Sequence, residues 1–532
     1  MFTDPRLSRR DFLKGALATA GLIAAGCAGG DEEETAPQPT VISEGEPKRG
    51  GTIRLASLVP ILSLDPHTTE GVSVAPNFYS YVVHATDWRG TVGDLAESWE
   101  IVDGLDWVFK LRAGVRFQDT PPVSGREVVG EDIVYSIDRL RSLPTASKTW
   151  DQWTEGYEAP DPRTFRLRTP KPYGYLLMDL GSPLTAVVPR EAVEQFGDLK
   201  SQALGSGPFM VGSYDRDQGL EIVRNPNYYV PEIPYVDGLS VRVMPDDASV
   251  QVAFRAGSLD VYNAENKLKA DTVSGVSGVS VRPYLSRPYA VLDLNGAKLE
   301  AFKDERIREA VDLALDRKVM IDKLYFGGAE LAGPVGPVWD SALPAEEVEA
   351  AYRRDVQRAR QLLSAASAED LHFKLSFASV GNWADRSAII QQNLAEAGIK
   401  VDLQPGELGA WLSDLLNGNF EATTYSHLAY LSDDIQLQWH HTYGWGRTPA
   451  AYRGIEDPQV DALLDQIHEA IDNEERIRLA RDVQRLILKR HGPSLVLFQP
   501  YGYWCAYDYI KGYTPTAYGF GLYKYDYWID KA

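Results

Sequence analysis

The sequence predicts an α/β protein with more than one lobe. The chain has 532 residues, and about 480 of them follow an N-terminal region with little to bury, which is more than one hydrophobic core normally supports. Along this part, segments with the two-residue period of strands alternate with segments that have the 3.6-residue period of helices. We therefore expect two or more lobes, each built from sheets and helices.

The N-terminal region has the features of an export signal. Arg9 and Arg10 precede an apolar, Ala- and Gly-rich stretch, 15–26, which ends at Cys27. About a dozen apolar residues are too few to cross a bilayer, which takes about 20 helical residues. The arginine pair is typical of a twin-arginine signal. We expect residues 1–26 to be a signal peptide.

Cys27 is the expected site of a lipid anchor. The sequence AAGC at 24–27 resembles a lipobox, in which the cysteine is acylated and becomes the mature N-terminus, although Ala24 stands where Leu is usual. The residues that follow, up to 51, are rich in Gly, Pro and acidic side chains, as in a flexible linker. Residues 27–51 are therefore predicted to tether the globular part to a membrane. The alternative is plain secretion or an uncleaved anchor.

The composition limits what the globular part can bind. A net charge of −21 disfavours nucleic acid and anionic lipid as partners. Cys505 is the only cysteine besides Cys27, so no intramolecular disulfide is expected once Cys27 is acylated. The signatures of zinc proteases, nucleophile-elbow hydrolases and phosphate-binding loops are missing. We expect a protein that is not an enzyme.

Four segments predict individual elements in chain order. They are a strand at 107–112 and helices at about 130–140, 304–317 and 457–467. In the strand, Trp107, Phe109 and Leu111 alternate with other residues and would share one buried face. Asp457 and Pro458 are a favourable N-cap and first-turn pair for the last helix. These are core features and do not identify a ligand.

Short motifs follow one another in a fixed order along the chain. They are LDPH at 64–67, LAESWE at 95–100, WVFKLRAGVRF at 107–117, GEDIVYS at 130–136, GSGPF at 205–209, RNPNYY at 224–229, FRAGSLD at 254–260, and FKDERIREA at 302–310 with LDR at 315–317. They resemble the extracellular solute-binding proteins of family 5, which include the dipeptide-, oligopeptide- and nickel-binding lipoproteins of ABC importers. The resemblance covers the chain from about Thr52 to the C-terminus. One departure is QDT at 118–120, where the family usually has His-Asp-Gly.

The resemblance implies a two-lobed periplasmic-binding-protein fold, the Venus-flytrap clamp of the large cluster. Lobe I is expected to carry an inserted subdomain, and the solute would bind between the lobes. The expected parts are lobe I at 52–87, 204–286 and 500–532, the insert at 88–203, and lobe II at 287–499.

The resemblance also implies the function. It predicts an exported, membrane-anchored substrate-binding component of an ABC importer, a monomer without a cofactor, whose partners are the permease and ATPase subunits. A peptide is the leading solute. An oligosaccharide is the alternative, favoured by 12 Trp and 28 Tyr, and opines, nickel chelates and other small solutes remain. A secreted hydrolase or a surface chaperone is the alternative from a different class.

Asp433 and Asp434 are the residues expected to anchor a peptide. In peptide-binding relatives, an Asp in a "W..D" segment of lobe II pairs with the α-ammonium of the ligand. Here 430–434 occupies the corresponding place, with Tyr430 for Trp. A buried ammonium needs a carboxylate partner, because an unpaired buried charge is costly. The alternative is that both acids belong to a solvated loop.

A polar and aromatic stretch follows at 436–447 and is either a wall of the cleft or ordinary packing. Its members that we expect to contact ligand are Trp439, Trp445 and Arg447. The neighbouring His440 and His441 do not predict a metal site, because adjacent residues point apart on a strand and miss the i, i+4 spacing on a helix.

The family position of three more residues makes them ligand candidates. Thr68 and Glu70 follow the first strand, and Tyr501 lies near the expected hinge. Most other motif residues are expected to be scaffold. Gly205 and Gly207, for example, suit a tight strand entry where a Cβ would not fit.

Overall fold

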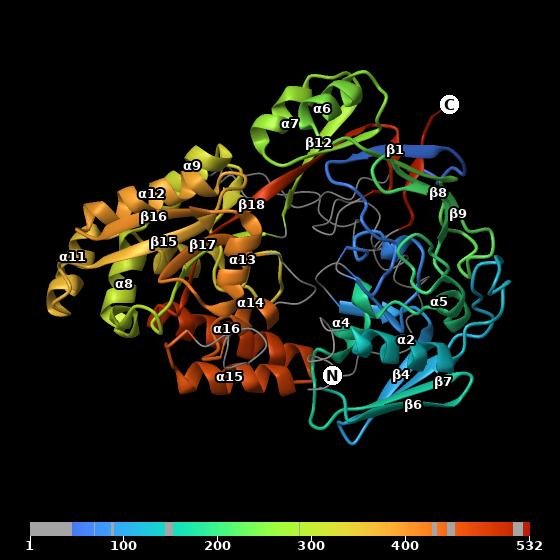
Figure 1. The fold of residues 1–532 in the computed structure, drawn as a ribbon, viewed down its shortest axis with the longest axis horizontal. Coiled ribbons are helices and arrows are strands. Elements are labelled where there is room, and N and C mark those ends of the chain that lie inside the picture. Colours follow the sequence, from blue (N-terminus) through green and yellow to red (C-terminus); the bar gives the residue numbers. More distant parts are fainter. Residues whose placement is uncertain are drawn as a thin grey trace, which may run out of the picture.

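The structure is a computed structural model. It describes residues 45–531 except 69, 87–89, 144–152, 287, 428–433, 444–452 and 514–524. Arg9, Arg10 and Cys27 therefore lie outside the described residues. Figure 1 shows two bodies, one with the blue and green N-terminal strands and one with the yellow and orange helices, joined by the long strand β18. Within the described part of the chain, no helix is long and apolar enough to cross a membrane.

The first body holds a four-stranded sheet. Its order is β1 (Thr52–Ser57), β10 (Gly238–Val243), β9 (Gly219–Arg224) and β8 (Phe209–Asp215). β1 is parallel to β10, and the other pairs are antiparallel. The sheet therefore joins the start of the described chain to a segment about 200 residues later, as expected for a lobe interrupted by an insert.

A second sheet of the same body lies in the predicted insert. Its strands, all antiparallel, are β4 (Ala96–Val102), β5 (Asp106–Leu111), β7 (Thr164–Arg168) and β6 (Gly156–Asp161). The predicted strand is confirmed as β5, in which Trp107, Phe109 and Leu111 are buried. The predicted helix near 130 is confirmed as α2 (Gly130–Ser142). Further elements in the described part of this region are β2 (Val83–Thr86), β3 (Gly90–Gly93), α4 (Leu176–Leu180), a 3-10 helix at Pro183–Thr185 and α5 (Arg190–Phe196).

One mixed sheet, with the order β11-β18-β13-β17-β15-β16, spans both bodies, and β13, β17, β15 and β16 lie in the second body. The strands are β11 (Val261–Ala264), β18 (Ser494–Tyr507), β13 (Tyr289–Leu294), β17 (Ala422–His427), β15 (His372–Ala378) and β16 (Lys400–Gly406). β15 is parallel to both β16 and β17. The helices of this region are α8 (Glu305–Ala314), α9 (Arg317–Tyr325), α10 (Ala345–Ala351), α11 (Val356–Ala365), α12 (Trp383–Glu396), α13 (Leu408–Asn417), α14 (Asp434–Gln438), α15 (Pro458–Glu469) and α16 (Asn473–Arg490).

β18 runs through both bodies. Its first half pairs with β13, and its second half pairs with β11 and with β12 (Val279–Leu285). Near α6 (Asp247–Arg255) and α7 (Lys267–Ser274), β18 and β12 form the upper bridge in Figure 1. The chain therefore passes between the bodies at two adjacent places, on β18 and between β12 and β13.

The predicted helix at 304–317 is wrong in its C-terminal part. α8 ends at Ala314, Leu315 is extended, and a new helix, α9, begins at Arg317. The break has a local cause, because the Asp316 side chain accepts a hydrogen bond from the Val319 backbone N–H and so acts as the N-cap of α9. The helix predicted at 457–467 is confirmed as α15, with Asp457 as its N-cap.

The expected role of Gly205 and Gly207 is confirmed. A Cβ at Gly205 would lie 2.2 Å from the Phe78 carbonyl oxygen, and one at Gly207 would lie 2.5 Å from the Phe78 carbonyl carbon. Backbone atoms cannot move aside as a flexible side chain can. The GSGPF motif is therefore a place where two backbone segments pack without room for a side chain.

Candidate ligand-binding site

The predicted ligand-binding residues fall into two groups. Tyr430, Asp433, Trp445 and Arg447 lie outside the described residues. Asp434 opens α14, but its side chain is not described. The other four, Thr68, Glu70, Trp439 and Tyr501, can be placed, and the structure puts the three with described contacts into three different networks.

Trp439 follows α14, and its ring packs against His427, the last residue of β17. Its ring is 4.6 Å from the ring of His427 and 6.4 Å from that of Tyr425. The ring of Tyr289 in β13 also stacks on His427, at 5.1 Å. Tyr289 is the first residue of β13, directly after the crossing from β12, so Trp439 belongs to an aromatic group beside this crossing.

A chain of buried hydrogen bonds links His427 and Tyr425 to Asp293 and Ser494. The Tyr425 hydroxyl donates to Asp293 Oδ2 at 2.9 Å, and the Ser494 hydroxyl donates to Asp293 Oδ1 at 2.6 Å. Because the Tyr425 proton is used in this way, His427 Nε2, 3.0 Å from the Tyr425 hydroxyl, is the donor to it. Burial raises the pKa of Asp293 to about 6. Burial lowers the pKa of His427 to about 3, so this histidine is neutral at neutral pH.

Thr68 is engaged in its own turn. Its hydroxyl donates to the Asp65 carbonyl at 3.0 Å and accepts from the Gly71 backbone N–H at 3.2 Å. Glu70 is exposed. The Thr68 hydroxyl therefore stabilises its own turn, and these hydrogen bonds do not indicate a ligand contact.

The preceding LDPH motif is a structural junction, which the sequence did not reveal. Arg139 of α2 donates from Nη1 to Asp65 Oδ1 and to His67 Nδ1, both at 2.8 Å. His67 Nε2 then donates to the Ala186 carbonyl at 2.9 Å. Burial lowers the pKa of His67 to about 4. The motif therefore joins the segment after β1 to α2 and to the residues before α5, and His67 is a neutral bridging group.

Tyr501 lies at the hinge itself. Its hydroxyl donates to the carboxylate of Glu330 in β14 (Ala329–Glu330), and both burial and this carboxylate raise the pKa of Tyr501. One residue earlier, the Pro500 carbonyl accepts from the backbone N–H and hydroxyl of Ser286 at 2.9 and 2.7 Å. The Gln499 side chain donates back to the Ser286 carbonyl at 2.8 Å. These bonds join the two interlobe crossings side by side.

The polar stretch that begins at 436 is mostly packing. Gln436, Gln438, His440 and His441 are all buried. The Gln436 side-chain carbonyl accepts from the Gly336 backbone N–H at 2.9 Å. For these residues the structure favours packing over a cleft wall. Among the described residues, no group of three or more His, Cys, Asp or Glu could hold a metal ion.

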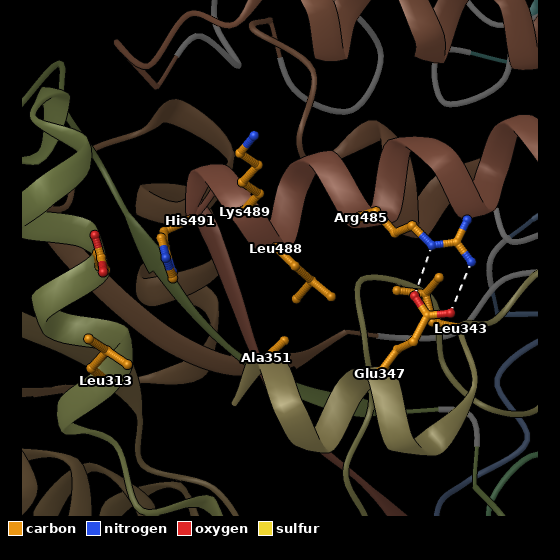
Figure 2. Close-up of a pocket in the computed structure, with 9 residues that line it drawn as sticks. Leu313, Leu343, Glu347, Ala351, Arg485, Leu488, Lys489 and His491 are labelled. Carbon is orange, nitrogen blue, oxygen red and sulfur yellow. Dashed lines mark hydrogen bonds and ion pairs between the residues drawn. The ribbon is translucent and has the colours of Figure 1, made fainter. Parts of the chain in front are cut away.

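A shallow pocket of about 370 Å³ lies in the second body, between α8, α10 and α16 (Figure 2). Leu313, Leu343 and Leu488 form its apolar part, and Arg485 donates two hydrogen bonds to Glu347 at 2.8 and 3.0 Å on its rim. All of its lining residues come from the predicted lobe II. A pocket between two lobes would draw its lining from both, so this one is not the predicted cleft.

Comparison with known proteins places this fold. The chain matches the family described as bacterial extracellular solute-binding proteins, family 5 Middle, over residues 90–448. Heme-binding protein A of Haemophilus influenzae is 24% identical over 95% of this chain and 96% of its own length. The periplasmic oligopeptide-binding protein OppA of Salmonella typhimurium is 27% identical over 79% of this chain and 82% of its own.

Solved structures give the same picture. HbpA2 from Haemophilus parasuis superposes with a TM-score of 0.78 at 20% identity, covering 90% of this chain and 100% of that one. DppA from Helicobacter pylori, in complex with the peptide STSA, superposes with a TM-score of 0.75 at 22% identity, covering 91% and 99%. The predicted two-lobed fold is confirmed. Because the family match spans more than half of the chain, this protein belongs to the bacterial extracellular solute-binding proteins of family 5.

Proposed function

We propose that this protein is the extracytoplasmic substrate-binding component of an ABC importer and that it captures a peptide between two lobes. The observation that carries the proposal is the pair of adjacent crossings at Ser286 and Gln499–Tyr501, which joins two separate bodies in a chain of this family. Two bodies on such a hinge can close on a solute, and a permease can distinguish the closed form from the open one.

The division into lobes follows from the same hinge. We assign lobe I to 52–87, 204–286 and 500–532, the insert to 88–203 and lobe II to 287–499. The β1-β10-β9-β8 sheet supports the assignment, because it joins the first two segments of lobe I in hydrogen-bonded pairs. The partners are the permease and ATPase subunits, and the protein acts as a monomer without catalysis.

The relatives of this chain are named for, or bound to, different classes of solute. OppA is named for oligopeptides and DppA is in complex with a peptide, whereas the relative with 95% coverage is named for heme, and another solved relative is in complex with agropinic acid. Oligosaccharides remain the alternative for the same clamp. Calorimetric titration with tripeptides and tetrapeptides, heme, an opine and a maltooligosaccharide tests the proposal. Saturable binding of peptides alone supports it, and binding of another class alone overturns the peptide assignment.

Asp433 or Asp434 is the proposed anchor of the peptide α-ammonium. If so, replacing the anchoring residue with Ala leaves the ammonium without a partner, and peptide affinity falls by about 2 kcal/mol or more. N-acetylated peptides lack the charge, so their affinity should not change. Calorimetry on Asp433→Ala and Asp434→Ala with both peptide types makes the comparison. Equal losses for both types would remove this assignment.

We further propose that the protein is exported through the twin-arginine route and held by a lipid on Cys27. The support is the order of features in the sequence, namely Arg9 and Arg10, a short apolar stretch, the AAGC motif and a polar linker. Under this proposal the globular part faces the periplasm or the cell exterior.

A further inference from the structure

A second contact between the two bodies lies opposite the hinge. In Figure 1 the hinge strands β12 and β18 bridge the bodies at the top, whereas α15 and α16 run along the bottom and reach the insert near α4. The segment 171–175 of the insert meets the α15–α16 connection of lobe II there. We call this contact the latch.

The latch has a backbone part. The Gly174 N–H donates to the His468 carbonyl at 2.7 Å, and Arg476 Nη1 donates to the Gly174 carbonyl at 3.2 Å. Beside them, Lys171 pairs with Glu469 at 2.8 Å. Both polar groups of the Gly174 backbone are therefore satisfied by lobe II, so separating the bodies removes both bonds at once.

The latch also has an aromatic part. The Trp153 ring stacks on Tyr173 at 4.5 Å and on His468 at 4.9 Å, and the Arg476 guanidinium lies 5.0 Å from the Tyr175 ring. Trp153, Tyr173, Tyr175 and His468 are each less than 7% exposed. Opening the clamp would bring these rings into water, which is unfavourable.

The α15–α16 hairpin is fixed to lobe II. Arg308 of α8 donates to the carbonyls of Arg490 and His491 at the C-terminal end of α16, at 3.1 and 2.5 Å. Arg485 of α16 pairs with Glu347 of α10. Rotation of lobe II about the hinge therefore carries the hairpin away from the insert.

We propose that the latch holds the clamp closed and stabilises the closed form even without solute. The inference rests on the proposed clamp function and adds a regulator to it. Any contact made only in the closed form shifts the population toward that form and raises the apparent affinity for solute. The insert then has a defined role as the second closing surface of the clamp.

Gly174→Ala tests the latch sharply. A Cβ at Gly174 would lie 2.0 Å from the Ala470 carbonyl oxygen, and its other near atoms belong to Ala470 and Arg476. The three nearest atoms are thus all on lobe II, so the substitution obstructs the closed form directly. Gly156→Ala is the matched control, because the same added methyl in the same insert meets no atom within 4 Å.

The measurement is small-angle X-ray scattering of solute-free protein, with circular dichroism to verify folding. The wild type and Gly156→Ala should give one radius of gyration, equal to that of the closed structure, and Gly174→Ala a larger one. His468→Ala removes the stacked ring from the lobe II side and should also increase the radius of gyration. This variant tests the latch if Gly174→Ala does not fold. An open wild type, or identical curves for folded variants, would overturn the latch. Since no solute is used, these outcomes are separate from a failure of peptide binding.

Discussion

At the scale of single residues, the LDPH motif shows how a family signature can be structural. Asp65 and His67 are buried and share the guanidinium of Arg139, which comes from helix α2. A helix cap such as Asp457 can be predicted from the sequence, because the cap and its helix are adjacent. The contact of the LDPH motif with Arg139 could not be predicted in this way, because Arg139 lies 72 residues from His67.

Replacing Asp65 with Ala should destabilise this junction. The substitution leaves the Arg139 charge, which is 12% exposed, without its carboxylate, and breaking a buried pair typically costs about 3–5 kcal/mol. Urea denaturation measures the loss. Asp271→Ala is the control, because its ion pair with Lys267 is about half exposed and should be worth less than about 1 kcal/mol. Equal effects of the two variants would contradict the role of the junction.

Buried neutral histidines should make the protein sensitive to acid. The folded-state pKa is about 4 for His67 and about 3 for His427 and His440, in each case lowered mainly by burial from 6.5. Below pH 6.5 the unfolded chain binds these three protons and the folded chain does not, so stability falls. Asp293 has the opposite effect, because burial raises its pKa to about 6. Below pH 6 its carboxyl binds one proton in the folded chain that the unfolded chain does not bind until lower pH. Together these groups should lower stability between pH 6 and 4 by at most about 3 kcal/mol per pH unit.

Urea midpoints at pH 7, 6 and 5 test this direction. His440→Leu should flatten the dependence, because one proton fewer is taken up on unfolding. A stability that stays constant from pH 7 to pH 5 would show that these histidines are not buried in the neutral form.

At the scale of elements, the spacing of apolar residues and the helix N-caps predicted where helices and strands lie. They did not predict where one helix ends and the next begins. α2, β5 and α15 appear where the sequence indicates them. The helix from 304 was expected to continue to 317 because its apolar spacing continues. Asp316 ends it, because its side chain caps α9 and the Arg317 side chain pairs with Asp312 in the core.

Gly207→Ala should weaken the strand entry at the GSGPF motif. The new Cβ would lie 2.5 Å from the Phe78 carbonyl carbon and 2.6 Å from the Tyr79 nitrogen. Overpacking of this kind typically costs about 1–3 kcal/mol. Gly275→Ala adds the same methyl in open space and should change stability by less than about 0.5 kcal/mol. Thermal unfolding compares the melting temperatures of the two variants. An unchanged melting temperature for Gly207→Ala would refute the packing argument.

At the scale of the whole molecule, the ordered motifs predicted the two-lobed fold, because each marks a scaffold position that the fold requires. The ligand site was less accessible to sequence reasoning. Thr68 and Tyr501 were chosen by family position, yet their hydroxyls bond to Asp65 and Glu330. Motif order reports the path of the chain, whereas a side chain's partner depends on residues distant in sequence.

Cys27→Ser tests how the molecule is held at the membrane. An acylated Cys27 predicts that the variant moves from the membrane fraction to the soluble fraction, because the lipid supplies the membrane affinity. Fractionation followed by immunoblotting measures this.

The double variant Arg9→Lys/Arg10→Lys should lose export altogether. Retention of Cys27→Ser in the membrane, or normal export of the arginine variant, would contradict the respective assignment.

Native mass spectrometry of the purified protein is the most direct test of its function as a peptide-capturing clamp. The account predicts one bound molecule per monomer, released on denaturation, with masses and fragments that are sums of amino-acid residues. A bound molecule that is heme, an opine or a sugar would contradict the peptide assignment. Protein that carries no solute, and takes up none from a mixed peptide library, would contradict capture of peptides.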